Sequence, residues 1–462
     1  MFFRIVQSRT FKYAMPCIII WSIGLLIFWP GMMSHDSIIQ WNQLSQNRYS
    51  NLQPVFHTLF MKSITMIWDS PGAVCLVQII MLGTLLGFFL KELESLGIQK
   101  KYIWLSSVFN AINPINIVLS ITLWKDILYT ILVLLCSLMF LKIGKAKTQF
   151  YSKKYNIILL PIVFTLPYLV RWNGLFILLG CFFFLYLLFP EKRRINATLF
   201  LSAIILVAIT KGLLTNIFQV SKSELLKYLV PIHQMGYFIH SDVQFNNSEI
   251  EFLNKISPTD TDWYYECGAE IASPWRDDFW EFDREFLIEN GDRFLNLWIN
   301  KVINNPLSLL NHYKCSTRYI WHPYAFMESK MQLKTVPREI DKTSGFRTYD
   351  GIRWIPYSND HKIESDSKLP QLVKPMTTYI KSSMFIWKPA IFLYLVFFIL
   401  FWQLYKKKYN AFLFTYLPII AHTLGLALVT ISPEFRYQYP VVFFCQLVII
   451  SCFIPIQNKI VR

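Results

Sequence analysis

Long apolar blocks are the feature of this sequence that most limits its fold. Each block holds about 15 to 22 residues with few charges, and a helix of that length crosses a hydrocarbon core about 30 Å thick. The blocks predict an α-helical polytopic membrane protein with about ten transmembrane helices. They cover residues 13–30, 73–90, 102–120, 127–143, 157–170, 174–190, 195–215, 384–405, 410–431 and 440–456.

The composition excludes other classes of protein. Hydrophobic residues make up 54% of the 462-residue chain and charged residues only 16%, against about 25% charged residues in an ordinary soluble domain. A soluble enzyme, a disordered chain and a disulfide-rich secreted protein are therefore excluded. The first apolar block follows a basic tail, but the next residues, Trp29, Pro30 and Gly31, form no small-residue cleavage site, so we expect it to remain as the first span.

The distribution of Lys and Arg predicts the topology. An even number of spans places both termini on one side, and short loops rich in Lys and Arg mark the cytoplasmic side. The four basic residues of one set of short loops are Arg48, Lys125, Arg171 and Arg436. The other set holds Arg4, Arg9, Lys12, Lys91, Lys100, Lys101, Lys142, Lys145, Lys147, Lys153, Lys154, Lys192–Arg194, Lys406–Lys408, Lys459 and Arg462. We therefore expect cytoplasmic N and C termini.

A long polar segment, residues 216–383, separates the spans into two groups. It carries 22 of the 29 acidic residues, and it is predicted to be a mainly helical extracytoplasmic domain, since loops of this length usually carry function. Its stretch 283–304 has helical spacing and ends before Pro306. The predicted domains are thus a bundle of about seven spans (1–215), the external domain (216–383) and about three spans (384–462). Cys267 and Cys315 are both external; they either pair or remain two free thiols.

Two shorter patterns lie within the N-terminal bundle. Residues 54–68 are too few to span, and Thr58, Lys62, Thr65 and Asp69 form one polar stripe on them. This pattern predicts a juxtamembrane helix in the interface plane beside Asp36, with a tilted or re-entrant span as the alternative. In the third span, three asparagines at positions 110, 113 and 116 predict a polar face turned to the bundle interior, for interhelical hydrogen bonds or a ligand cavity.

Charged residues recur at the predicted outer ends of the spans. They are Asp36 in the first loop, Lys125-Asp126, Arg171-Trp172-Asn173-Gly174 and Glu434-Phe435-Arg436-Tyr437. Taken singly, each is explained by interfacial anchoring of Lys, Arg, Trp and Tyr. Together they place three carboxylates and three cations on one side of the membrane, where charge is costly and usually functional.

The arrangement of these motifs resembles the GT-C glycosyltransferases, which take a sugar from a polyprenyl-phosphate carrier outside the cytoplasm. The resemblance rests on Asp36 after the first span, on Gln53-Pro54-Val55-Phe56-His57 in place of an HPP-like segment, on Asp126, and on the ERY-like Glu434-Phe435-Arg436-Tyr437. The His-Pro order of the family is not kept here. The chain is also similar to uncharacterised bacterial multispan families with PG…D, KD, R-x-N-G and RY motifs, mainly over residues 1–215 and 430–440.

The resemblance and the chemistry together assign roles to the outer residues. Asp36 is the expected general base for an acceptor hydroxyl. Arg171 and Arg436 are expected to bind the donor phosphate, with Lys125 in support, and Asp126 is a second acid that orients the acceptor or holds a cation. His35 is a second candidate base or an interfacial residue. The remaining expected substrate-binding residues are His57, Asn173, Glu434 and Tyr437.

The predicted function is transfer of a sugar from a polyprenyl-phosphate donor to a glycan or lipid acceptor at a bacterial cytoplasmic membrane. A cofactor is not established by the sequence, and a divalent cation, Mg²⁺ or Mn²⁺, stays open. A polysaccharide polymerase or ligase is the neighbouring alternative; a lipid or polysaccharide transporter or flippase would need repeats that the sequence does not show, and an assembly scaffold is a third. Membrane lipid is an expected partner. Nucleic acid is not, because the inner loops account for the net charge of +16.

Overall fold

The computed structural model of the 462-residue chain describes residues 8–260, 263, 282–323, 334–335, 347–349, 352–354, 387–406, 410–430 and 434–455. Two compact units are present. The first contains residues 1–221, 331–425 and 436–462, and the second contains residues 222–330 and 426–435.

All ten apolar blocks form helices, but they differ in length. Five helical segments are long and apolar enough to cross a membrane, and a bent pair makes a possible sixth. The five are α2 (Arg9–Ile27), α5 (Pro71–Ser95), α8 (Lys125–Ala146) with its 3₁₀ extension η1 (Lys147–Ser152), η2 (Pro190–Lys192) with α11 (Arg193–Ile217), and η4 (Ala411–Thr415) with α21 (Tyr416–Val429).

The other blocks give shorter helices. These helices are too short to be identified as membrane spans by their length, so the count of ten spans stays a prediction. They are α9 (Lys154–Val170), α10 (Gly174–Leu188), α20 (Pro389–Tyr405) and α22 (Tyr439–Ser451).

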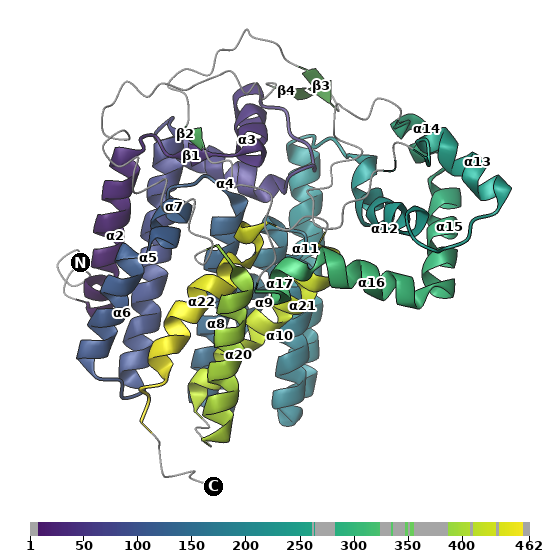
Figure 1. The fold of residues 1–462 in the computed structure, drawn as a ribbon. Coiled ribbons are helices and arrows are strands. Elements are labelled where there is room, and N and C mark those ends of the chain that lie inside the picture. Colours follow the sequence, from purple (N-terminus) through teal and green to yellow (C-terminus); the bar gives the residue numbers. More distant parts are fainter. Residues whose placement is uncertain are drawn as a thin grey trace. The chain divides into compact units, whose positions relative to one another are not determined.

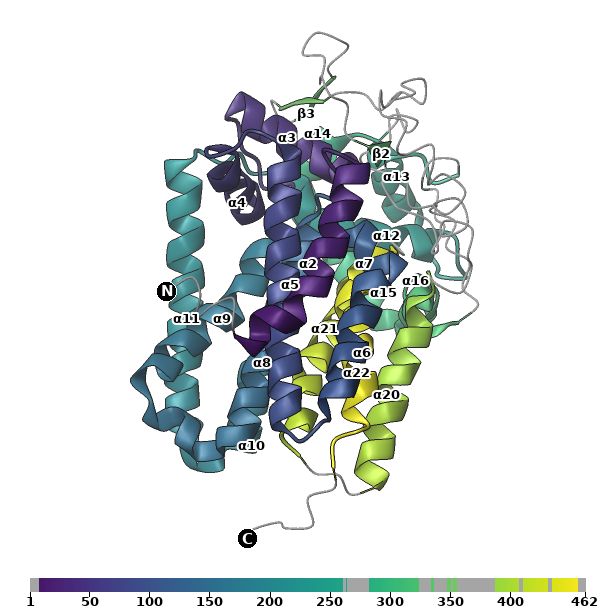
Figure 2. The same cartoon turned by 90° about the vertical axis from the view of Figure 1, so that its left-hand side faces the viewer.

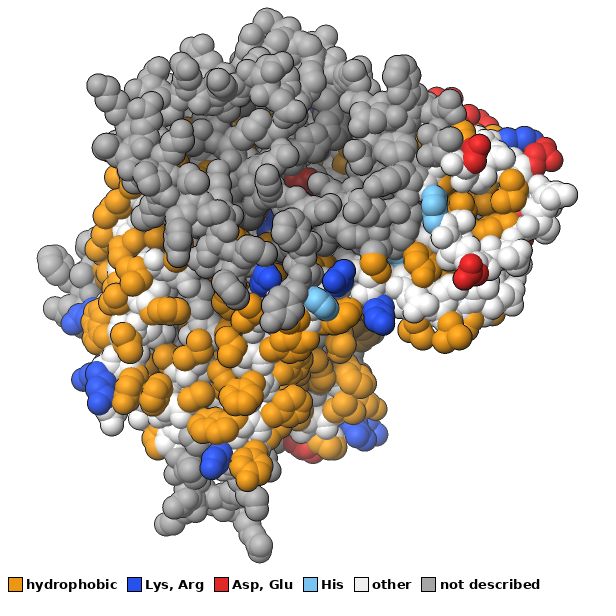
Figure 3. Space-filling model, viewed as in Figure 1, with side chains coloured by type: hydrophobic (Ala, Val, Ile, Leu, Met, Phe, Trp, Pro, Cys, Tyr) orange, Lys and Arg blue, Asp and Glu red, His pale blue; other side chains and the backbone are white. Residues whose placement is uncertain are grey.

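The helices of the first unit pack together through apolar side chains, and further apolar side chains cover their outer surface. Helix α8 is the most buried of the candidate spans, and α2 packs against α5 (Figures 1 and 2). Gly87 in α5 permits this close approach, because a Cβ there would collide with the backbone oxygen of Thr10. Large apolar side chains such as Phe109, Phe398 and Phe401 remain exposed, and hydrophobic side chains cover much of the helical surface in Figure 3. That surface is the one expected to face lipid.

The third predicted span is broken at Asn113, where the sequence had predicted a continuous polar face. Helices α6 (Lys100–Ile112) and α7 (Pro114–Ser120) meet at an angle of 59°. Pro114 disfavours helical geometry at the preceding residue, and Asn113 adopts extended backbone and accepts a hydrogen bond from Ile115 N–H at 3.0 Å. The asparagine at 113 therefore caps a helix and does not continue the stripe.

The two other asparagines of this stripe do face the interior. Asn116 donates to the backbone oxygen of Asn110 at 3.1 Å and to Gln446 Oε1 of α22 at 2.7 Å. Tyr439, also in α22, donates to Asn116 at 3.2 Å. Of the two readings left open by the sequence, interhelical hydrogen bonding accounts for this pair.

The segment 54–68, predicted to be a juxtamembrane helix, contains the helix α4 (Val55–Thr65), which follows α3 (His35–Gln46). Its position at a membrane stays a prediction. Two residues of its polar stripe face α3: buried Thr58 accepts a hydrogen bond from Gln40 at 3.0 Å, and Lys62 donates to Asn47, the residue after α3, at 3.0 Å. Met66 and Ile67, just beyond the helix, are exposed. Polar contacts with α3, rather than with solvent, thus fix the orientation of α4.

Strands are few among the described residues. β1 (Met32–Met33) pairs antiparallel with β2 (Lys334–Thr335), and β3 (Arg347–Tyr349) pairs antiparallel with β4 (Ile352–Trp354). The register of the first pair joins Met32 to Thr335. A short strand from the first loop is thereby tied to residues about 300 positions later in the chain.

The second unit is helical and has its own hydrophobic core. Tyr228, Met235, Phe238, Leu253 and Phe294 are among its fully buried side chains. Its elements are η3 (Glu224–Tyr228), α12 (Leu229–Ile239), α13 (Asn247–Ile256), α14 (Arg284–Glu289), α15 (Gly291–Asn304), α16 (Pro306–Ser316) and α17 (Arg318–Trp321). The predicted 283–304 helix is thus two helices.

Cys315 of this unit is disulfide-bonded. Cys267, for which the sequence leaves open a bond to Cys315 or a free thiol, lies outside the described residues.

Two histidines lie against each other in the interior of the second unit. The rings of His233 and His312 lie 4.7 Å apart. Burial, followed by the neighbouring His312, lowers the pKa of His233 to about 2, and burial lowers that of His312 to about 4. Both rings are therefore neutral at pH 7.

We expect acidification to destabilise this unit, beginning near pH 6.5. Unfolding returns both histidines to their ordinary pKa near 6.5, so the unfolded chain binds protons that the folded chain cannot. Stability is complete above that pH and falls below it, approaching about 1.4 kcal/mol per histidine for each pH unit. Hydrogen exchange in α12 and α16, corrected for intrinsic rates, should accelerate between pH 7 and 5 in the wild type. Exchange should accelerate less in the His233→Gln variant. An equal acceleration in that variant would show that His233 is not the source of the acid sensitivity.

Candidate functional site

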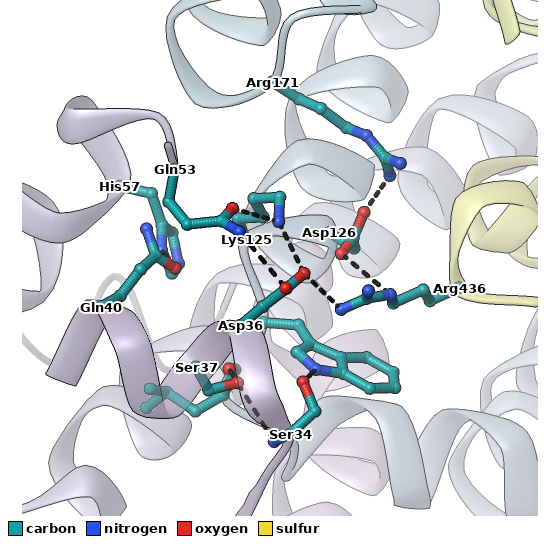
Figure 4. A network of polar contacts seen from close by, with 12 residues as sticks. Ser34, Asp36, Ser37, Gln40, Gln53, His57, Lys125, Asp126, Arg171 and Arg436 are labelled. Atoms are coloured by element: carbon teal, nitrogen blue, oxygen red, sulfur yellow. Dashed lines mark hydrogen bonds and ion pairs between the residues drawn. The ribbon is translucent and has the colours of Figure 1, made fainter. Parts of the chain in front are cut away.

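Four helix ends meet at one cluster of charged side chains in the first unit (Figure 4). Asp36 lies in the first turn of α3, and Lys125 and Asp126 begin α8. Arg171 directly follows α9, and Arg436 lies in the 3₁₀ helix η5 (Phe435–Gln438) before α22. The carboxylates thus lie at helix N-termini and Arg171 at a C-terminus, the ends whose partial charges favour them.

Backbone contacts explain why Asp36 meets Lys125. Met32 N–H donates to the Ile121 oxygen at 2.9 Å, and Leu123 N–H donates to the Met32 oxygen at 2.8 Å. These bonds hold the loop before α3 against the loop before α8. The hydroxyl of Ser37 also donates to the Leu123 oxygen, and the Trp124 indole donates to Ser34. The two loops, about 90 residues apart in the chain, are therefore fixed side by side.

Asp36 is held by two cations and one amide. Lys125 Nζ and Arg436 Nη1 each lie 2.9 Å from Asp36 Oδ2. Gln53, before α4, donates to Asp36 Oδ1 at 3.2 Å and accepts from Lys125 at 2.5 Å. The Asp36 side chain retains 22% of its exposure, more than any of its charged neighbours in the cluster. It is the cluster's most accessible acid.

Asp126 forms a second, more deeply buried pair. Its side chain is 1% exposed and is ion-paired with Arg171. The other oxygen, Oδ2, lies 3.8 Å from Arg436 Nε, so Arg436 links the two carboxylates. The Arg171 guanidinium lies 4.0 Å from the centre of the Tyr437 ring, a cation–π contact. Among the described residues, the cluster thus contains three cations and two carboxylates.

His57 lies beside this cluster with its ring fully buried. Gln40 donates to Thr58, so its oxygen faces His57 Nδ1 at 3.0 Å. This geometry places the proton on Nδ1 and leaves the lone pair on Nε2, which has no hydrogen-bond partner within the described part of the chain. Burial and then Lys125 lower the pKa of His57 to about 3. The ring is therefore neutral at pH 7 and can accept a hydrogen bond.

The structure brings together Asp36, Lys125, Asp126, Arg171 and Arg436, and it places Tyr437 under Arg171. Asn173 is buried in the turn after Arg171, and neither polar atom of its side chain has a hydrogen-bond partner among the described residues. Glu434 belongs to the second unit, and the side chain of His35 lies outside the described residues, although its backbone begins α3.

Sequence reasoning missed three contributors. Gln53 bridges Asp36 and Lys125, and Trp124 lies with its ring 4.9 Å from the Arg436 guanidinium. Gln438 is buried near the end of η5, with both side-chain polar atoms unpaired among the residues described. Gln53 is the first residue of the Gln53-Pro54-Val55-Phe56-His57 motif, and Trp124 and Gln438 directly adjoin Lys125-Asp126 and Tyr437. That proximity was the available signal.

Among the residues that the structure describes, no group of three or more His, Cys, Asp or Glu side chains is placed to hold a metal ion. Asp36 and Asp126 both face basic side chains. Comparison of the chain with protein-family profiles, curated proteins and solved structures found no match.

Proposed function

We propose that this chain is an integral-membrane glycosyltransferase of the GT-C type, which moves a sugar from a polyprenyl-phosphate carrier to a cell-envelope glycan or lipid acceptor. In this proposal about ten helices span a bacterial cytoplasmic membrane, both termini are cytoplasmic, and residues 216–383 are extracytoplasmic. The long apolar helices and the uneven distribution of Lys and Arg support this topology.

The observation that carries the proposal is the buried cluster of three cations and two carboxylates at the ends of apolar helices. Three cations that converge in a site of low dielectric suit an anionic ligand such as a lipid phosphate. The same cations would stabilise the negative charge that develops on that phosphate as the sugar leaves. A soluble nucleotide sugar would not need a site at helix ends near lipid.

In the proposed reaction an acceptor hydroxyl oxygen attacks the anomeric carbon of the donor sugar, and the bond from that carbon to the phosphate oxygen breaks. The hydroxyl proton passes to Asp36. In the resting structure Lys125 and Arg436 neutralise Asp36. The donor phosphate would compete for both cations, and Asp36, released from them, becomes a better proton acceptor.

Asp126 has a positioning role in this proposal. Its carboxylate is almost inaccessible and is paired with Arg171, so it fixes the direction of a phosphate-binding guanidinium. Of the two roles expected for Asp126, orienting the acceptor or holding a cation, the second would then be filled by Arg171 of the chain itself. A requirement for Mg²⁺ or Mn²⁺ is measurable by adding a chelator to the transfer assay.

The test is reconstitution of the full chain in nanodiscs with radiolabelled polyprenyl-phosphate sugars and cell-envelope acceptors. We expect label to move to an acceptor, and Arg436→Gln to weaken donor binding because it removes a phosphate-binding charge. Failure of folded protein to bind or consume any polyprenyl-phosphate sugar would overturn the proposal. Label that joins two carrier-linked glycans would instead identify a polymerase.

A polysaccharide ligase is the second candidate, and one observation favours it. Asp36 is held by two cations, which suits a permanent counter-ion as well as a base. A ligase that works through its arginines would keep turning over without this carboxylate. The Asp36→Asn variant therefore separates the two candidates.

A further inference from the structure

A row of exposed aliphatic side chains crosses the junction of α15 and α16 in the second unit. Ile299 and Ile303 of α15 are 45% and 68% exposed, and Leu307 and Leu310 of α16 are 75% and 62% exposed. Ile299 and Ile303 are four residues apart in α15, and Leu307 and Leu310 are three apart in α16, so each pair lies on one side of its helix. The helix break at Asn305 separates the two pairs. Figure 3 shows hydrophobic side chains along the edge of this unit where Figure 1 places α16.

The opposite side of the same two helices packs against the core of the second unit. Phe294 is buried in the core of the second unit, and Trp298, Val302 and Leu309 pack against that core. Trp298 also donates to Gln234 of α12 at 2.9 Å. The exposed row is therefore a second apolar face, which the fold of this unit does not need. Contiguous apolar patches of this kind mark interaction sites.

Hydrogen bonds within the second unit place α16 at one end of a candidate membrane span. This unit includes the last turn of α21, from Leu426, and α21 belongs to the apolar segment Ala411–Val429. Tyr313 of α16 donates to the Leu428 oxygen at 3.3 Å, and Tyr319 of α17 lies 3.0 Å from the Thr430 hydroxyl. Leu310 is three residues before Tyr313, about 4.5 Å along the helix axis. The exposed row thus begins within one turn of a residue bound to the span.

We propose that the junction of α15 and α16 inserts into the membrane interface, with Ile299, Ile303, Leu307 and Leu310 among the lipid acyl chains. A phospholipid bilayer is the occupant that the structure favours, because a span ends beside α16. Lys314 and Arg318, which are exposed on α16 and α17, have the charge to bind lipid phosphates at headgroup level. Apolar burial together with basic flanks is the usual pattern of an interfacial helix.

Nitroxide labels measure this depth directly. The full chain carrying Leu307→Cys is labelled and reconstituted in nanodiscs of phosphatidylcholine and phosphatidylglycerol, and collision with oxygen is compared with collision with a water-soluble nickel chelate. Glu251→Cys, at an exposed polar position of α13 in the same unit, is the matched control. Unmutated protein, treated with the label in parallel, gives the background.

We expect oxygen to reach the label at position 307 several-fold more readily than the nickel chelate does, and the reverse order at position 251. Labels at Ile303→Cys and Leu310→Cys should agree with position 307, so the result does not depend on one variant. Equal access of the nickel chelate to positions 307 and 251 would overturn the proposal, because the row would then face water. Protection from both reagents would also overturn it and would indicate a second protein chain on this surface.

Discussion

Replacing Asp36 with asparagine is expected to lower sugar transfer by about 10²–10⁴-fold, the usual contribution of a general base. Asparagine has nearly the same shape and still accepts a hydrogen bond from Lys125, but it cannot take up the acceptor's proton. Donor binding should be unchanged or tighter, since Lys125 and Arg436 lose the carboxylate that competes with phosphate for them. The turnover rate is measured by release of radiolabelled sugar, and the donor affinity by titration of the unreacted carrier.

The split between turnover and binding distinguishes catalysis from structure. Glu92→Gln is the matched control, because Glu92 is also paired with a lysine, Lys145, at 2.6 Å. Glu92 lies near the C-terminal end of α5 and is not part of the Asp36 cluster. This variant should transfer sugar at the wild-type rate. Full turnover by folded Asp36→Asn would show that Asp36 is only a counter-ion and would favour the ligase. Loss of both donor binding and fold would instead assign it a structural role.

The helices of this chain were predictable because membrane helices leave a simple signal: a run of apolar residues long enough to cross lipid. Their ends were not predictable to the same degree. Asn113 and Pro114 break the third block, and the stretch 283–304 divides at Asn290 and Gly291. In both places the apolar pattern continues through a break in the backbone, and local backbone geometry decides the outcome.

The candidate site could be predicted in part for a related reason. Charged residues at membrane depth are rare, so Asp36, Lys125, Asp126, Arg171 and Arg436 were recognisable from their position alone. The sequence could not show which of these charged residues pair with one another. That Asp36 binds both Lys125 and Arg436, while Asp126 binds Arg171, depends on how four helix ends converge. Gln53 and Gln438 are uncharged polar residues, and the sequence indicated them only by their place within or beside a motif.

The second large expected effect is a loss of stability when the buried ion pair of Asp126 and Arg171 is broken. We expect Asp126→Asn to lower the free energy of unfolding by about 3–5 kcal/mol, the typical cost of removing one partner from a buried ion pair. The side chains of Asp126 and Arg171 are 1% and 11% exposed, so water cannot readily replace the carboxylate. Thermal unfolding of the detergent-solubilised chain can be followed with a thiol-reactive dye, because Cys17, Cys75 and Cys136 are buried until the bundle opens.

Two further variants test whether the cost comes from an uncompensated charge. Glu251→Gln breaks an exposed pair with Lys255 and should leave the unfolding temperature unchanged, since such pairs contribute little. The double variant Asp126→Asn with Arg171→Gln removes both buried charges and should recover much of the lost stability. If the double variant were as unstable as Asp126→Asn alone, the loss would come from packing or hydrogen bonds. Recovery of stability without recovery of transfer would instead indicate that Arg171 is kept for its positive charge toward a ligand, at a cost that Asp126 offsets.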